Sequence, residues 1–227
     1  KITSVSVAAD VAVAFTTPDA EANHVLQQSL DLIQWSDLIG AKLSNEGEVF
    51  SFNIARPAGP TSYFRVGILP PPPLFYDGFE GGPQEGWEAA EPWATGTTST
   101  GPGAAFAGDN VYATNLEGAF PDLVQASLKS PVVDLTGVTR PKLTFQYYID
   151  ATEGSEGVQL KYLNADGSEL FVEEDIFWGQ SDGWQQYRKT IPSAAQDQPI
   201  RIEFLLLSDD SGPNGDGFYL DDFTIDD

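Results

Sequence analysis

The nine residues GFYLDDFTI, at positions 217–225, decide the fold class of this 227-residue chain. Apolar and aromatic side chains crowd the stretch without a helical period, which indicates a β-strand. In a regular strand Asp221 shares one face with Tyr219 and Phe223, and Asp222 lies on the other face. At least one of the two aspartates is therefore expected to point into the protein.

Working outward from this stretch, the rest of the second part of the chain is also rich in strand patterns and shows no sustained helical period. The further predicted strands are 74–79, 110–115, 126–133, 142–149, 157–163, 168–175, 184–191 and 200–207. Residues 162–170 are expected to form a hairpin. Nine antiparallel strands over about 150 residues predict a two-sheet jelly roll.

A strong boundary precedes this part, because residues 70–73 are four consecutive prolines, which favour an extended spacer. Residues 1–69 hold 7 acidic and 4 basic residues, net −3, whereas residues 74–227 hold 27 and 7, net −20. We therefore predict two β domains, 1–69 and 74–227, joined by a linker at 70–73.

The first domain is expected to be a small sandwich of short strands. Its predicted strands are 4–7, 11–15, 23–28, 32–35, 49–54 and 62–68, with turns at 45–47 and 57–60. The stretches LQQSLDLIQWS (26–36) and YFRV (63–66) resemble the immunoglobulin-like or fibronectin-III-like repeats of large secreted bacterial proteins. That resemblance implies an Ig/FnIII-like sandwich.

The overall composition excludes several classes of function. The net charge of −23 repels nucleic acid and anionic lipid, so we expect neither as a partner. No run of about 20 apolar residues is present, so no membrane-spanning segment is expected. The chain has no cysteine, which excludes disulfides and zinc–thiolate sites. It also has no methionine, and we expect it to be part of a larger multidomain protein.

Four motifs of the second domain together resemble one family. They are FYDGFE (75–80), GDNVYATNL (108–116), SLKSPVVDL (127–135) and the terminal GFYLDDFTI. In this order they resemble the jelly-roll modules of the MAM and immune-inhibitor-A-like type, a group that includes many carbohydrate-binding modules. The resemblance implies a secreted or cell-surface domain that binds polysaccharide, matrix or protein. It also implies a structural calcium ion that ties the first strand to the last.

The resemblance implies a specific set of calcium ligands. Its members are the carboxylates of Glu80, Asp109 and Asp222, a carbonyl of Gly78, and assistance from Asp77 or Asp221. Such oxygen atoms are the ligands that Ca²⁺ prefers, and a buried carboxylate cluster is costly without a cation. The alternative is that these acids are solvated strand ends.

Exposed aromatic rings are the expected ligand-binding groups, because sugar rings stack on them. Trp178 lies in a loop-like stretch between strands, where it is either a sugar platform or a plug for the end of the sandwich. Tyr147 and Tyr148 are adjacent on one strand, so one of them should point outward. The other four tryptophans are expected to be core residues: Trp35, Trp87, Trp93 and Trp184.

Catalysis has little support in the sequence. His24 is the only histidine and is interpreted as an ordinary strand residue, which disfavours a Ser-His triad or a zinc hydrolase site. The acidic run 173–175 is expected to be a solvated strand edge, although a glycosidase with two carboxylates stays an alternative. We therefore predict a non-catalytic, calcium-stabilised module that binds carbohydrate or matrix. The alternative is a structural, adhesive or protease-associated domain that binds protein.

Overall fold

The computed structural model describes the chain except residues 19–21, 39, 58–60, 70, 120 and 212–214. The chain divides into two compact units, Lys1–Pro72 (unit 1) and Pro73–Asp227 (unit 2), and the predicted all-β fold class is confirmed. Within the described residues the only helical element is a short 3-10 turn, η1 (Ser193–Ala195). Most of the predicted turn at 57–60 and the first proline of the predicted linker lie outside the described residues.

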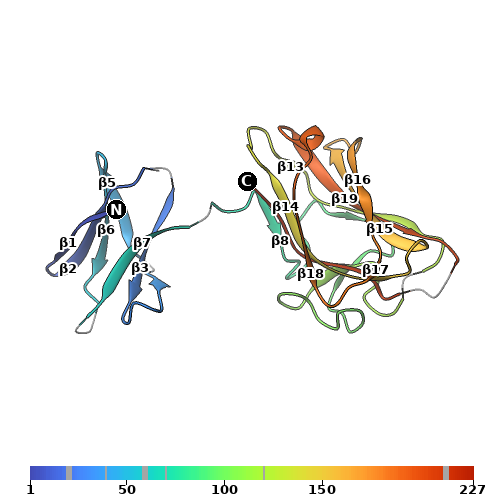
Figure 1. Ribbon diagram of the computed structural model, residues 1–227, viewed down its shortest axis with the longest axis horizontal. Helices are drawn as coiled ribbons and strands as arrows, with labels where there is room; N and C mark the ends of the chain where they lie inside the picture. Colours follow the sequence, from blue (N-terminus) through green and yellow to red (C-terminus); the bar gives the residue numbers. More distant parts are fainter. Residues whose placement is uncertain (19–21, 39, 58–60, 70, 120, 212–214) are drawn as a thin grey trace. The chain divides into compact units, whose positions relative to one another are not determined.

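Unit 1 is a small sandwich of two sheets (Figure 1) with strand orders β1-β2-β6-β5 and β4-β3-β7. The strands are β1 (Ile2–Val7), β2 (Asp10–Phe15), β3 (Asn23–Ser29), β4 (Ser36–Asp37), β5 (Lys42–Glu46), β6 (Val49–Ala55) and β7 (Tyr63–Leu69). Alternate residues fill the space between the sheets, and the buried core is Val11, Val13, Phe15, Leu26, Phe50 and Phe52. His24 on β3 is buried with its ring 5.1 Å from that of Phe15, as expected of an ordinary strand histidine.

Two predictions for unit 1 are wrong. Residues 32–35 do not form a strand, because the Asp31 carboxylate accepts the backbone N–H groups of Ile33 and Gln34 and folds the segment into a turn. The next strand, β4, begins only at Ser36. Trp35 is not a core residue, since its ring lies partly exposed under the Arg65 guanidinium, 4.4 Å from the ring centre. The sequence also missed β5, whose residues are all exposed.

Unit 2 is a larger sandwich of two sheets. Sheet I has the strand order β10-β11-β20-β14-β17. In the same sheet β18 pairs with β14, and β8 pairs with β20. Sheet II has the strand order β16-β15-β19-β12-β9, and β13 also pairs with β19. The strands are β8 (Phe75–Asp77), β9 (Glu88–Ala89), β10 (Ala94–Gly96), β11 (Val111–Ala113), β12 (Gln125–Lys129), β13 (Val133–Asp134), β14 (Lys142–Ala151), β15 (Glu156–Asn164), β16 (Glu169–Phe177), β17 (Gly179–Gln180), β18 (Gln185–Thr190), β19 (Pro199–Ser208) and β20 (Gly217–Asp226). Each of the nine strands predicted for this part overlaps an observed strand, but the predicted strand 126–133 is divided into β12 and β13, and β9, β10 and β17 were not predicted.

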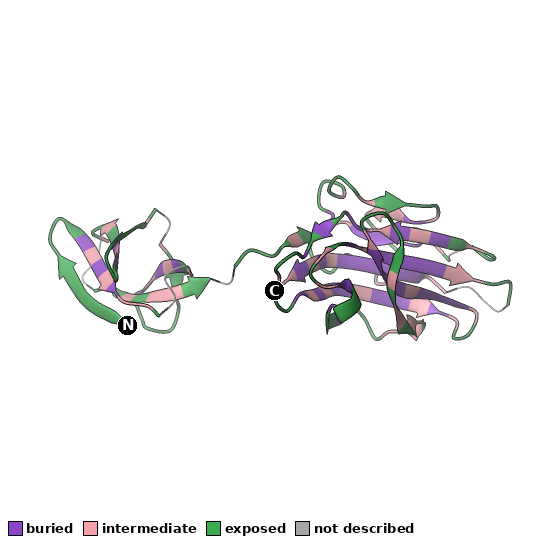
Figure 2. Ribbon diagram, turned by 90° about the horizontal axis from the view of Figure 1, so that it is seen from above, coloured by how far each residue is buried: buried purple, intermediate pink, exposed green. Residues whose placement is uncertain are grey.

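The core of unit 2 lies between the two sheets, where buried residues follow the long central strands (Figure 2). Aromatic rings dominate it. Phe204 from sheet II lies 5.2 Å from the ring of Phe145 and 6.0 Å from that of Phe218, both from sheet I. Trp93 is buried here as predicted, and Trp87 packs against the same core while partly exposed. Such burial is the main stabilising contribution to the unit.

The stretch that decided the fold, β20, contains a bulge. Gln146 pairs with Asp221 and Thr144 pairs with Thr224, so a single residue of β14 opposes two residues of β20. Asp222 sits in this bulge with a φ of 48°. The bulge reverses the alternation, so Phe223 packs in the main core whereas Asp221 stays on the opposite face of sheet I. The expectation that Asp221 and Phe223 share a face is therefore wrong.

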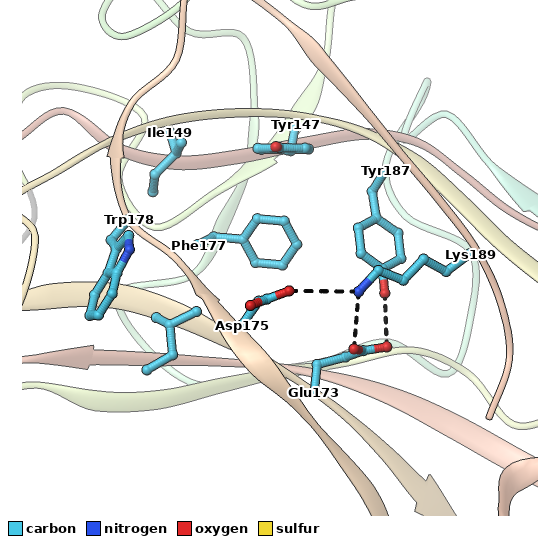
Figure 3. Close-up of a pocket in the computed structure, with 9 residues that line it drawn as sticks. Tyr147, Ile149, Glu173, Asp175, Phe177, Trp178, Tyr187 and Lys189 are labelled. Carbon is cyan, nitrogen blue, oxygen red and sulfur yellow. Dashed lines mark hydrogen bonds and ion pairs between the residues drawn. The ribbon is translucent and has the colours of Figure 1, made fainter.

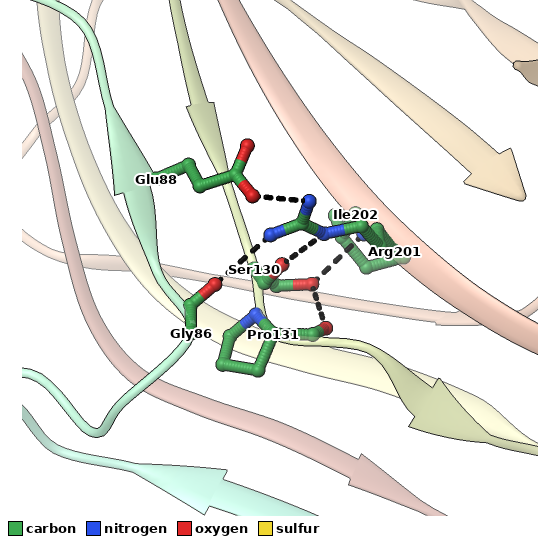
Figure 4. A network of polar contacts seen from close by, with 6 residues as sticks. All are labelled: Gly86, Glu88, Ser130, Pro131, Arg201 and Ile202. Carbon is green, nitrogen blue, oxygen red and sulfur yellow. Dashed lines mark hydrogen bonds and ion pairs between the residues drawn. The ribbon is translucent and has the colours of Figure 1, made fainter. Parts of the chain in front are cut away.

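A polar clamp fastens the loop before β9 to sheet II (Figure 4). The Arg201 guanidinium donates to the carbonyl oxygens of Ser130 (2.8 Å) and Gly86 (2.9 Å) and to the Glu88 carboxylate (2.7 Å). The Ser130 hydroxyl accepts the N–H of Ile202 at 2.9 Å. Because each nitrogen of the guanidinium meets an acceptor, this partly buried arginine is compatible with the fold.

Candidate functional site

A cleft opens at one side of unit 2, where the edge strand β16 of sheet II faces β14 and β18 of sheet I. Its volume is about 290 Å³. Its apolar lining is Tyr147, Ile149, Ile176, Phe177, Trp178 and Tyr187, and its polar lining is Glu173, Asp175 and Lys189 (Figure 3). Among the described residues, β16 has no further strand on its outer side.

The chain changes sheets at the cleft. β16 ends at Phe177 in sheet II, and β17, which begins at Gly179, pairs with β14 in sheet I. Gly179 has a φ of 77°, a conformation that glycine adopts without strain. Trp178 lies at this crossing and is 43% exposed. A large apolar ring is therefore held at the surface by backbone that is anchored on both sides.

Aromatic rings continuous with the core form the floor of the cleft. The ring of Tyr147 lies 4.9 Å from that of Phe177 and stacks at 5.9 Å on the buried Phe218. The ring of Tyr187 stacks at 4.6 Å on Phe145. These contacts fix the rings, so the apolar wall is formed before any ligand arrives.

The polar side of the cleft centres on Glu173. Its carboxylate accepts the Tyr187 hydroxyl at 3.0 Å and the Lys189 ammonium at 3.1 Å (Figure 3). Lys189 also lies 4.0 Å from the carboxylate of Asp175, whose side chain is 94% exposed, whereas that of Glu173 is 14% exposed. Burial, and then the neighbouring Tyr162, raises the pKa of Tyr187, so its hydroxyl stays protonated and donates to Glu173.

The structure brings only part of the predicted ligand-binding set together. Trp178 and Tyr147 line the same cleft. Tyr148 points to the opposite face of sheet I, where it is buried with its ring 5.7 Å from that of Tyr219. It is covered by a second apolar cluster that includes the partly exposed Trp184, so Tyr148 does not belong to this site.

Sequence reasoning missed Glu173, Tyr187 and Lys189. The acidic run 173–175 is not simply a solvated edge, because Glu173 turns toward the sandwich and pairs across to β18. Period-two alternation was the available signal: Glu173 and Asp175 are spaced at intervals of two from Phe177. The strand at β18 was predicted, but the sequence pattern does not show that it faces β16 across the cleft.

The predicted calcium ligands do not form one cluster of side chains. In the part of the chain that the structure describes, no group of three or more acidic or histidine side chains is placed to hold a metal. Asp77 is buried and accepts the N–H groups of Phe79 (2.8 Å) and Gln84 (2.8 Å) and the indole N–H of Trp87 (2.9 Å). Its oxygens are therefore used by the protein itself.

Asp222 and Gly78 also contact a side chain of the same unit. The Asp222 carboxylate accepts the Tyr76 hydroxyl at 2.7 Å, which, with burial, raises the pKa of Tyr76 to about 12. A Cβ atom on Gly78 would lie 2.6 Å from the same hydroxyl oxygen. These three residues form a small contact between β8 and the bulge of β20.

Glu80 and Asp221, by contrast, converge on one loop. A single oxygen of Glu80 accepts the backbone N–H groups of Asp109 and Asn110, each at 2.9 Å, and Asp221 accepts that of Ala107 at 3.0 Å. The amides of Asn110 and Asp109 lower the pKa of Glu80. Asp221 is fully buried, and burial raises its pKa to about 6, whereas the backbone N–H groups of Ala107 and of Asp222, the latter at 2.7 Å, favour its ionised form.

Comparison with known proteins begins with a negative result, since no family model matches the chain. One curated protein, Bacillopeptidase F of Bacillus subtilis (strain 168), is 26% identical over 145 residues. The match covers 63% of this chain and 10% of that protein. The chain thus spans a small part of its relative.

Several solved structures are similar to the chain. The K1 cleaved adhesin domain of Lys-gingipain from Porphyromonas gingivalis W83 is 18% identical, with a TM-score of 0.45 and coverage of 66% of this chain and 96% of that domain. TmCBM61, solved with β-1,4-galactotriose, is 17% identical, with a TM-score of 0.45 and coverage of 65% and 92%. A carbohydrate-binding module of the β-sandwich superfamily is 14% identical, with a TM-score of 0.44 and coverage of 95% and 92%. These similar structures are β-sandwich binding and adhesin domains.

In the described residues of this chain no helix is long and apolar enough to cross a membrane.

Proposed function

We propose that unit 2 is a non-catalytic module that binds carbohydrate in the cleft at Trp178. One observation carries the proposal: a 43% exposed tryptophan and Tyr147 line the same cleft, which also holds two carboxylates and an ammonium. Sugar rings stack their C–H faces on such aromatic rings, while charged neighbours fix the hydroxyl groups. An aromatic surface next to hydrogen-bonding groups suits a sugar better than a purely apolar ligand.

Binding is favoured over hydrolysis by the environment of the two carboxylates. A glycosidase needs one carboxyl group held protonated, usually by an apolar pocket. Asp175 is almost fully exposed, and Glu173 already accepts hydrogen bonds from Lys189 and Tyr187. Neither group is arranged as a general acid, so the cleft is suited to hold a glycan rather than cleave it.

Replacing Trp178 with alanine is expected to weaken glycan binding up to about tenfold, because an aromatic contact contributes about 0.5–1.5 kcal/mol beyond the area it buries. The measurement is affinity electrophoresis against a panel of polysaccharides, followed by calorimetry on the glycan that retards the protein. Phe106→Ala is the matched control, since Phe106 is 49% exposed and does not line the cleft. Unchanged retardation of the Trp178 variant would move the site elsewhere, and binding of protein partners without any glycan would favour the adhesive alternative.

The cellular context belongs to the same proposal. We infer that the module is exported as an accessory part of a larger protein, outside the cell or on its surface. The partial coverage of Bacillopeptidase F supports a module within a longer chain, and the acidic surface suits a soluble exported domain.

We also propose that a calcium ion stabilises the loop at 107–110. Glu80 and Asp221 would supply carboxylate oxygens, and backbone carbonyl groups with water would complete the oxygen shell that calcium needs. The support is the burial of Asp221 next to a loop that Glu80 also holds. The ion would offset the buried charge, and its role would be structural.

Removal of calcium is expected to lower the melting temperature of unit 2, because an ion that binds only the native state stabilises it by about 2.7 kcal/mol at a hundredfold excess over Kd. Scanning calorimetry with calcium and with chelator measures the difference. Glu80→Gln should lose most of the response, whereas Glu117→Gln, which removes an exposed charge elsewhere, should keep it. Identical melting curves for the wild type, together with no calcium in metal analysis, would contradict the site.

A further inference from the structure

The cleft offers a ligand more hydrogen-bond acceptors than donors. Glu173 and Asp175 together carry four carboxylate oxygens, whereas Lys189 is the only cationic side chain of the lining. That ammonium already lies 3.1 Å from Glu173 and 4.0 Å from Asp175. One negative charge of the lining is therefore uncompensated, and a ligand is bound best if it brings donors and positive charge.

The charge of the domain around the cleft is also negative. Residues 74–227 carry 27 acidic and 7 basic side chains, net −20, and Glu174 lies between the two cleft carboxylates in the sequence. Such a surface repels uronic-acid and sulfated glycans and concentrates cations in the cleft. A neutral sugar is tolerated, and a cationic sugar is attracted.

Lys189 shows where a ligand's ammonium fits. Its Nζ atom stands at the mouth between the two carboxylates (Figure 3), on a side chain that is 46% exposed. Asp175, with a 94% exposed side chain and only the 4.0 Å contact, keeps acceptor positions for a second ammonium. Trp178 lines the same cleft, and its ring face attracts cations as well as sugar C–H groups.

We propose that the cleft selects glycans that carry free amino groups, such as chains of β-1,4-linked glucosamine. This inference rests on the proposed carbohydrate-binding function of the same cleft. The aromatic side of the cleft stacks on the sugar ring, while Asp175, supported by Glu173, binds the amine substituent. Acetylation of the amine removes its charge and therefore removes the preference.

Three tetrasaccharides test the inference because they differ only in the substituent at carbon 2: the tetramers of glucosamine, N-acetylglucosamine and glucose. We expect calorimetry at low salt and mildly acidic pH to give about three- to fivefold tighter binding of the glucosamine tetramer than of the glucose tetramer, because an ion pair with an exposed carboxylate contributes up to about 1 kcal/mol. The acetylated tetramer should bind no more tightly than the glucose tetramer. Asp175→Asn should remove the preference without changing the affinity for the glucose tetramer, and Trp178→Ala should weaken all three.

Two controls separate recognition from general attraction to an acidic protein. Glu117→Gln changes the net charge as Asp175→Asn does, and it should retain the preference. Tetralysine, which has the charge without the sugar ring, should bind more weakly than the glucosamine tetramer. Equal binding of the three tetrasaccharides, or of tetralysine and the glucosamine tetramer, would overturn the inference while leaving the carbohydrate-binding proposal in place. Absence of binding by every tetrasaccharide and polysaccharide would overturn both.

Discussion

Replacing Phe218 with alanine is expected to destabilise unit 2 by about 3–5 kcal/mol, the range for removing a buried phenylalanine ring. Phe218 has no exposed surface, and its ring lies 5.4 Å from that of Phe177 and 5.9 Å from that of Tyr147. It also lies 6.2 Å from Trp93 on the core side. The substitution therefore opens a cavity between the core and the floor of the cleft.

Urea denaturation followed by tryptophan fluorescence measures this loss, because four of the five tryptophans belong to unit 2. Phe106→Ala removes the same atoms from a 49% exposed ring and should cost well under half as much. Phe218→Leu should destabilise unit 2 less than Phe218→Ala. It should still weaken glycan binding, because Tyr147 and Phe177 lose the ring that supports them. A loss below about 1 kcal/mol for Phe218→Ala would mean that the core between the sheets is not packed as described.

The strands of unit 2 were predictable because their signal is local. The long strands are rich in apolar and aromatic residues without a helical period, and β14, β15, β19 and β20 are found within two residues of their expected bounds. Short strands such as β17 were missed because two residues carry no period. The bulge at Asp222 was missed for a different reason: it depends on the register between β14 and β20, which no single strand encodes.

The candidate site was only half predictable for the same physical reason. Trp178 and Tyr147 stand out in the sequence as aromatic residues near polar ones. The contact of Glu173 with Tyr187 joins strands from different sheets, so it depends on how the sandwich closes at its edge. Tyr148 was an equal candidate to Tyr147 until the structure showed which face of β14 meets the cleft.

Replacing Asp77 with alanine is expected to destabilise unit 2 by about 3 kcal/mol, because three N–H groups, one of them buried, lose their acceptor. The carboxylate accepts the N–H of Phe79 and, through its other oxygen, those of Gln84 and the Trp87 indole. Phe79 is fully buried with a φ of 60°, a conformation that is strained for a phenylalanine. Asp77 therefore holds both a strained turn and the ring packing that follows it.

The same substitution separates the structural role of Asp77 from a role in calcium binding. If the carboxylate serves the protein's own donors, Asp77→Ala should lose the same stability in calcium and in chelator, as measured by urea denaturation. Asp134→Ala is the matched control, since Asp134 accepts one N–H, that of Thr136, in an exposed turn and should cost about 1 kcal/mol or less. A loss that appears only when calcium is present would instead place Asp77 among the ligands of the ion, together with Glu80 and Asp221.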